Sequence, residues 1–253
     1  MIDYIRYGIL LSTFLFFSGK GVSQSISANV DPFEKVIISP HIKVRFVEGD
    51  HETVNIDDMS VDPEKIRIKV IGRTLRIYLD GAKFLTRKEK VYSKYKKNKI
   101  PRYSGTEVIA TINYKRLKKI SVRGEQTMIC QSPLKQDRFR LWVYGESKVV
   151  LDSVDLGTLR ASIYGEGDLT VKSGVIGRQR YIAFGKSSVN TVATDNRKSK
   201  VTAFGEGTFK FNVRKKLKVT AYGEALVEYD GSPNVNRGII IGKAKIRKIK
   251  DSH

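Results

Sequence analysis

The chain has 253 residues, of which 47 are lysine or arginine and 26 are aspartate or glutamate, so its formal net charge is +21. A single cysteine excludes an internal disulfide, so the fold must depend on its hydrophobic core. The positive charge predicts attraction to polyanions, and the length allows one large domain or two small ones.

Residues 1–23 have the features of a signal peptide. Arg6 precedes an apolar run from Tyr7 to Phe17, and Gly21-Val22-Ser23 places small residues at a cleavage site. The run is shorter than the roughly 20 residues that span a bilayer, and no other segment is a candidate for a transmembrane helix. Cleavage would remove two basic residues and one acidic residue, leaving a net charge of +20. We therefore expect a secreted protein, located in the periplasm or on the outer cell surface.

Residues 29–113 are expected to form an amino-terminal β region. Short runs rich in β-branched residues are separated by turn residues such as Pro40, Asp62-Pro63 and Gly72. These runs are too closely spaced to follow the longer repeat found in the second half of the chain. We expect them to form a small β layer, either a cap over the first coil of that repeat or a first domain.

A basic loop is predicted over 83–102, where nine lysine or arginine residues accompany one acid, Glu89. Such a charge run is typical of a solvated loop. The alternative is that Tyr92, Tyr95 and Tyr103, which alternate with the lysines, stack on an anionic polymer.

The region 114–250 contains a phrase that ends in glycine and occurs seven times. Successive glycines are 21, 20, 20, 20, 18 and 19 residues apart: Gly124, Gly145, Gly165, Gly185, Gly205, Gly223 and Gly242. Apolar residues recur at period two within each copy, which favours strands over helices. We predict an all-β fold, a parallel β-solenoid (β-helix-like) with coils of about 20 residues that stack about 4.8 Å apart.

Strand alternation separates the repeat into inward and outward columns. The second residue before each glycine is small or apolar and is predicted to face inward: Val122, Val143, Ile163, Ala183, Ala203, Ala221 and Ile240. The fifth residue before each glycine is always basic and is predicted to face outward: Lys119, Arg140, Arg160, Arg180, Lys200, Lys218 and Arg237.

An aromatic column precedes the glycines on the same outer face: Tyr144, Tyr164, Phe184, Phe204 and Tyr222. Sugars stack on aromatic rings and anionic groups bind arginine and lysine, so the two columns together are a candidate track for an acidic glycan. The alternative is structural, because the rings could stack on one another or lie beneath the amino-terminal strands or a second subunit.

Carboxylates follow five of the glycines: Glu125, Glu146, Glu166, Glu206 and Glu224. Clustered carboxylates suit calcium, but these residues have lysines nearby that they can balance. We expect no metal site and no cofactor. The three histidines, His41, His51 and His253, lie outside the repeat phrases, which disfavours a catalytic site there.

Several segments resemble a family of secreted or envelope proteins from Bacteroidota, described as putative auto-transporter adhesin, head GIN domain. The resemblance covers about residues 30–245 and rests on these segments: DPFEKVIISPHIKVRFVEGDHETVNI, TINYKRLKKISVRGE, SIYGEGDLTV and AFGEGTFKF. It implies a β-helix-like fold and an envelope or extracellular location. The chain departs from the family phrase G-S-G-[SD] because Glu or Lys follows its glycines, and it is more basic.

The sequence therefore predicts a non-enzymatic binding or adhesion protein whose basic and aromatic columns recognise an acidic polysaccharide or another polyanion. The chain has no motif of a nucleic-acid-binding module. The alternatives are a structural envelope protein without a ligand and a carbohydrate-active enzyme of the β-helix type. The oligomeric state is left open.

Overall fold

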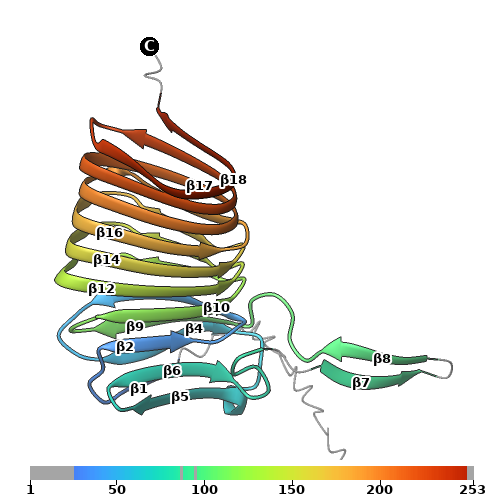
Figure 1. Cartoon of the computed structure of the whole chain (residues 1–253). Coiled ribbons are helices and arrows are strands. Elements are labelled where there is room, and N and C mark those ends of the chain that lie inside the picture. Colours follow the sequence, from blue (N-terminus) through green and yellow to red (C-terminus); the bar gives the residue numbers. More distant parts are fainter. Residues whose placement is uncertain (1–25, 86–87, 94–95, 250–253) are drawn as a thin grey trace, which may run out of the picture.

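The computed structural model describes residues 26–85, 88–93 and 96–249, so the predicted signal peptide lies outside the described residues. Figure 1 shows a column of stacked β coils with a two-stranded arm beside its amino-terminal end. One sheet contains 16 of the strands and a second contains two. The prediction of an all-β parallel solenoid is confirmed, with about 6 turns. The described part of the chain contains no helix that could span a lipid bilayer.

Each coil contributes strands on both sides of its corner glycine. The strands before the glycines pair in parallel in chain order and form the pre-glycine face: β10 (Lys119–Gly124), β12 (Leu134–Gly145), β14 (Val154–Gly165) and β16 (Gly174–Phe184). The shorter strands after the glycines form the post-glycine face: β11 (Thr127–Cys130), β13 (Lys148–Leu151) and β15 (Asp168–Val171). Both faces continue through β17 (Ser187–Asp230) and end at β18 (Asn234–Lys248).

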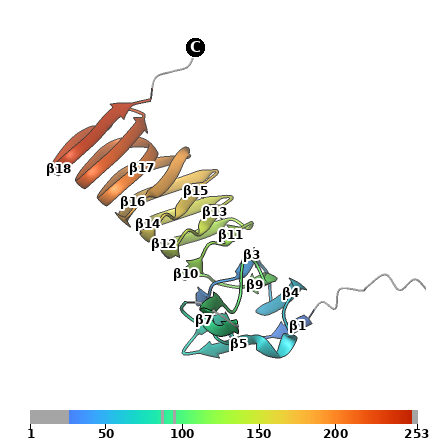
Figure 2. The same ribbon diagram turned by 90° about the vertical axis from the view of Figure 1, so that its right-hand side faces the viewer.

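The amino-terminal strands extend the same solenoid, which the spacing of their sequence runs did not predict. Two coils stack in parallel below β10 and β11: first β2 (Lys35–Ile38) with β3 (Ile42–Glu48), then β6 (Thr74–Leu79) with β9 (Val108–Tyr114). The outermost strands pair antiparallel and cover this end: β5 (Ile66–Ile71), β4 (Thr53–Met59) and β1 (Ile26–Asn29). Figure 2 shows these strands at the end opposite β18.

The basic segment 83–102 was predicted to be a loop, but it contains an antiparallel hairpin of β7 (Lys88–Ser93) and β8 (Lys96–Pro101). The hairpin forms a sheet of its own and projects from the solenoid (Figure 1). Tyr95 lies outside the described residues, and the side chain of Tyr92 is not described either, so the proposed stacking role of the tyrosines stays a prediction.

The corner glycines stack directly on one another. Gly165 has a φ of +115°, and a Cβ built on it would lie 2.7 Å from the carbonyl oxygen of Gly145. Both conditions exclude a side chain, because L-residues rarely adopt this φ and the neighbouring backbone cannot move away. Pro40 occupies the corresponding corner below Gly124, and its Cα lies 3.0 Å from the position that a Cβ on Gly124 would take. The repeat therefore requires glycine because successive corners touch.

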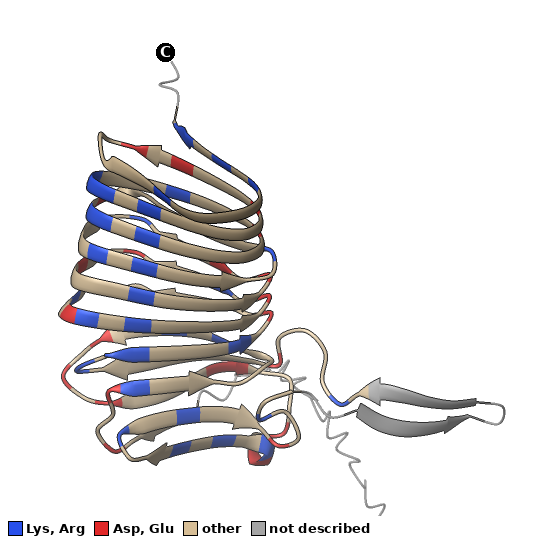
Figure 3. Cartoon of the chain, in the orientation of Figure 1, with Lys and Arg blue, Asp and Glu red and all other residues tan. Residues whose placement is uncertain are grey.

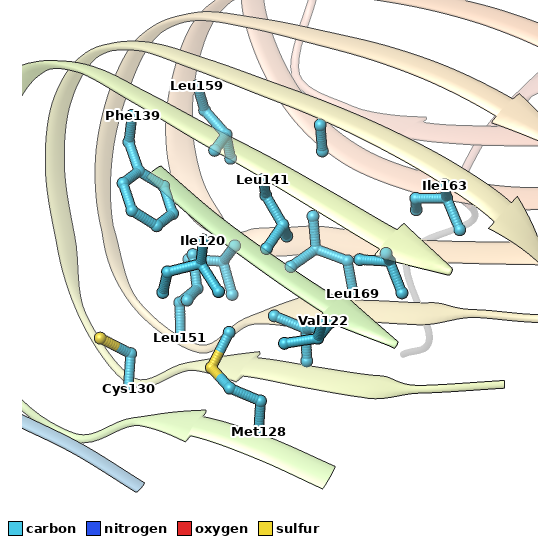
Figure 4. Packing of buried hydrophobic residues seen from close by; sticks show 14 of the residues in the cluster. Ile120, Val122, Met128, Cys130, Phe139, Leu141, Leu151, Leu159, Ile163 and Leu169 are labelled. Carbon is cyan, nitrogen blue, oxygen red and sulfur yellow. The ribbon is translucent and has the colours of Figure 1, made fainter. Parts of the chain in front are cut away.

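The predicted inward columns fill the solenoid, as the labelled side chains of Figure 4 illustrate. Val122, Ile163 and Ala203 are at most 3% exposed, and the residues on the opposite wall, such as Met128 and Leu169, are equally buried. Ile240 is only partly buried, since it belongs to the last coil and has no further coil above it. Each coil thus buries its inward side chains against those of the coils on either side, as expected for a repeat protein.

One layer of the core is polar. Tyr181 donates a hydrogen bond of 2.8 Å to the side-chain oxygen of Gln179, whose nitrogen donates one of 2.7 Å to Ser199. Asn196 donates a bond of 2.8 Å to the backbone oxygen of Asn212. These buried groups are therefore satisfied internally, which offsets their desolvation.

Candidate polyanion-binding groove

The predicted basic column is present, and its members lie on successive coils. In the sheet register Lys119 is opposite Arg140, Arg140 is opposite Arg160, Arg160 is opposite Arg180, and Arg180 is opposite Lys200. Lys218 follows in the next turn of β17. The column also begins one coil earlier than predicted, because Lys35 of β2 is opposite Lys119.

The seventh predicted member, Arg237, is not in the column. A register shift between Val219 and Ala221 places Asn236 opposite Lys218 and Arg237 opposite Val219. Within this last pairing the offset changes from 18 residues at Lys218 and Asn236 to 19 residues at Ala221 and Ile240, as one extra residue in β18 requires. The prediction that all seven basic residues form one ladder is therefore wrong at its carboxyl-terminal end.

A second basic column runs beside the first and was missed in the sequence analysis. Arg138, Arg178 and Lys198 precede the first column by two residues and share its outward face, with Thr158 at the one non-basic position. Lys216 occupies the equivalent place in the next turn. The signal was available in the sequence as a recurring basic-x-basic phrase: Arg138-Phe139-Arg140, Arg178-Gln179-Arg180, Lys198-Ser199-Lys200 and Lys216-Leu217-Lys218.

The two columns line a groove of about 420 Å³ on the pre-glycine face. Figure 3 shows their basic residues as blue bands on successive coils. Nine cationic side chains line the groove: Arg138, Arg140, Arg160, Arg178, Arg180, Lys198, Lys200, Lys216 and Lys218. None of the nine forms an ion pair with an acid among the described residues, whereas Lys172 pairs with Asp152 at 2.7 Å and Arg214 with Asp195 at 2.6 Å.

Lys119 extends the first column beyond the groove and contacts an aromatic ring. Its Nζ lies 3.4 Å from the ring centroid of Trp142. Burial lowers the pKa of Lys119, and the positive charges of Lys35 and Arg140 lower it further. The ammonium group is therefore held by a cation–π contact in place of a carboxylate.

The five predicted aromatic residues stack on one another. Successive ring centroids from Tyr144 to Tyr222 are 5.0, 5.1, 4.7 and 4.9 Å apart, with interplanar angles of at most 8°. The guanidinium of Arg123 lies 5.2 Å from the first ring, and Ile241 is opposite Tyr222 at the other end. The rings therefore stack on one another, as the structural alternative expected, and both faces of each inner ring are covered by its neighbours.

The row is nevertheless not hidden by the amino-terminal strands. Tyr164 is 38% exposed and Phe184 is 37% exposed, so the edges of the rings remain in contact with solvent. A sugar could touch these edges, but it could not stack on a face of the inner rings. The aromatic row therefore supports the coils, and the basic groove is the better candidate for a binding surface.

The acidic column beyond the glycines is partly neutralised by lysines on neighbouring coils. Lys186 lies 3.8 Å from Glu206, and Lys243 lies 3.9 Å from Glu224. The described part of the chain holds no group of three or more potential metal-ligating side chains.

The fold and the groove define a class of protein: a parallel β-solenoid with an unneutralised basic groove along one face. Residues 32–233 match the family described as putative auto-transporter adhesin, head GIN domain, and the chain belongs to this family. A search of curated proteins finds no match.

Solved structures share the fold at low sequence identity. A putative adhesin from Bacteroides fragilis is 18% identical, with a TM-score of 0.73 over 89% of this chain and 96% of that one. A putative adhesin from Parabacteroides merdae is 20% identical, with a TM-score of 0.60 over 92% and 98%. A putative lipid binding protein from Parabacteroides distasonis is 16% identical, with a TM-score of 0.59 over 92% and 98%. At these identities the likeness establishes the fold alone.

Proposed function

We propose that this chain is a non-enzymatic, adhesin-like binding protein of the cell envelope or cell exterior, and that it holds an acidic polymer, above all an acidic polysaccharide, in the basic groove. The observation that carries the proposal is the set of nine groove cations without ion-pair partners among the described residues. Membership of an adhesin family supports a binding role and an envelope or extracellular location.

The groove geometry suits an extended anionic chain. Strands of neighbouring coils are about 4.8 Å apart, so both columns offer a regular series of cations along the solenoid axis. Most groove positions on the earlier coils are arginine, and those on the later coils are lysine. Arginine can bind a carboxylate or sulfate with two parallel hydrogen bonds. A polymer lying along the axis would contact every coil from β12 to the carboxyl-terminal half of β17.

A structural envelope role without a ligand is the second candidate, and the stacked aromatic row favours it. The rings contribute to coil packing whether or not anything is bound. A purely structural role, however, gives no reason for two adjacent columns of like charge. The two candidates therefore differ in whether the protein binds acidic polymers through the basic columns.

Titration of the mature protein with heparin, polygalacturonate and neutral dextran tests the proposal. We expect both acidic polymers to bind and the neutral one to remain unbound. Binding should weaken with salt, because the Debye length falls from about 10 Å at 0.1 M to about 3 Å at 1 M. The triple substitution Arg160→Gln, Arg180→Gln and Lys200→Gln should reduce the slope of log affinity against log salt by about 2–3, taking about 0.7–0.9 per cation from nucleic-acid binding.

The matched control neutralises three exposed cations on the other side of the solenoid: Lys43→Gln, Arg45→Gln and Lys148→Gln. This control removes the same net charge but leaves the groove intact. Equal losses of affinity in the two triple variants would show that net charge alone attracts the polymer. Binding that neither variant affects would refute the groove as its site, and failure of the parent protein to bind either acidic polymer would favour the structural role.

A further inference from the structure

A second pocket of about 470 Å³ lies at the amino-terminal end of the aromatic row, separate from the basic groove. Three segments form it: the turn at Pro40 and His41, the connection at Phe84 and Leu85, and the corners around Gly124 and Gly145. These segments are far apart in the sequence and meet only because the β2–β3 coil stacks beneath β10.

One wall of the pocket is apolar and exposed. Phe84 is 57% exposed and Leu85 is 83% exposed, so two adjacent large apolar side chains contact solvent here. The guanidinium of Arg123 lies between two rings, 5.1 Å from the centroid of Phe84 and 5.2 Å from that of Tyr144. The Nζ atom of Lys83 lies 5.7 Å from the centroid of the Phe84 ring, so two cations hold this ring while more than half of the Phe84 surface remains accessible.

The opposite wall is fixed by hydrogen bonds. The side-chain oxygen of Gln126 accepts bonds from the backbone N–H of His41 at 2.8 Å and of Glu125 at 3.3 Å, and its nitrogen donates to the backbone oxygen of Gly105 at 2.9 Å. His41 has a φ of 71°, a left-handed conformation that is uncommon outside glycine. Backbone strain of this kind occurs preferentially at binding sites, where the surrounding contacts maintain it.

Two carboxylates line the pocket on successive coils, Glu125 and Glu146. Both are exposed, and neither forms an ion pair within the described part of the chain, although Glu206 and Glu224 of the same column pair with lysines. Their oxygens are thus available as acceptors, while the Arg123 guanidinium, which also lines the pocket, offers donors.

The side chains that line the pocket indicate what kind of ligand it would bind. An exposed ring favours a molecule with an apolar face, and free carboxylates with a neighbouring guanidinium favour one that carries hydroxyl groups. The carboxylates disfavour an anionic ligand. A cationic ligand is disfavoured as well, because the Arg123 guanidinium already fills the space between the rings of Phe84 and Tyr144. We propose that the pocket binds a neutral saccharide unit, and this inference does not depend on polyanion binding in the groove.

The proposal can be tested by titrating the protein with a panel of neutral trisaccharides built from hexoses, deoxyhexoses and N-acetylhexosamines. Ligand-observed NMR and calorimetry measure the binding. A shallow open pocket predicts a Kd of about 0.1–1 mM for at least one of them. Because the saccharide carries no charge, salt has no ion pair with the pocket to screen. The affinity should therefore stay within about twofold between low and high salt.

Two pocket variants should weaken binding at least fivefold, Phe84→Ala and Glu146→Gln. The matched control is Glu166→Gln, which makes the same change one coil further along the column and outside the pocket. The Arg160, Arg180 and Lys200 triple variant should also bind the saccharide normally. The inference is overturned if no neutral trisaccharide binds, or if Glu166→Gln weakens binding as much as Glu146→Gln.

Discussion

Replacing a corner glycine with alanine should be far more costly than replacing a turn glycine, although both have positive φ. In Gly165→Ala, the new Cβ would lie 2.7 Å from the Gly145 oxygen and 3.2 Å from its Cα. Backbone strain costs about 1–3 kcal/mol, and overpacking adds about 1–3 kcal/mol. Together they predict a loss of about 2–6 kcal/mol, or roughly 5–20 °C in Tm at about 2–4 °C per kcal/mol for a domain of this size.

Gly72→Ala is the matched control. Gly72 has a φ of +55°, but apart from its two chain neighbours no described residue has an atom within 4 Å of the position that a Cβ would take there, so only the left-handed backbone is penalised. That penalty is about 1–2 kcal/mol. Thermal unfolding followed by circular dichroism measures both variants. Equal decreases in Tm would refute the explanation that the glycine repeat exists because stacked corners touch.

Two further predictions concern the core. Ala203→Leu should overpack the narrow coil and lower the free energy of unfolding by about 1–3 kcal/mol, and an unchanged urea midpoint would contradict the inward assignment. Burial raises the pKa of the Cys130 thiol from 9.0 to about 12. As the pH rises, the thiol therefore ionises in the unfolded chain before it ionises in the folded protein. Its contribution to the free energy of unfolding is fully present below pH 9 and is lost by up to about 1.4 kcal/mol per pH unit toward pH 12. Urea unfolding between pH 7 and 11 should show this decline, and Cys130→Ala should reduce its slope.

The columns could be predicted from the sequence because the strand period and the glycine spacing both repeat. Once Gly145 and Gly165 are aligned, alternation alone assigns Arg160 outward and Ile163 inward, and the register agrees. A slip of one residue would have exposed every apolar side chain of a coil, so the pattern allowed only one register.

The first coil escaped prediction because its corner residue differs. Pro40 stands where the later coils have glycine, so Lys35 was not recognised as the start of the basic column. The bulge that displaces Arg237 was equally inaccessible, because an irregularity within a strand leaves the residue types of the column unchanged. The role of the aromatic row could not be predicted either, because it depends on how the rings are oriented. A period-two pattern places Tyr164 on the outer face of the solenoid whether the faces of its ring are free or covered by neighbouring rings.

The fold does not require a basic side chain at every position of the two basic columns. The two basic columns offer ten positions from β12 to the later turns of β17, and nine are lysine or arginine. Thr158 shows that an uncharged side chain fits the same sheet position. Like charges opposite one another destabilise a sheet, yet no acid among the described residues neutralises the nine, whereas Glu228 pairs with both Arg247 and Lys210 elsewhere on the solenoid. The basic columns therefore cost stability that an anionic partner in the groove would offset, and this cost supports our proposal of such a partner.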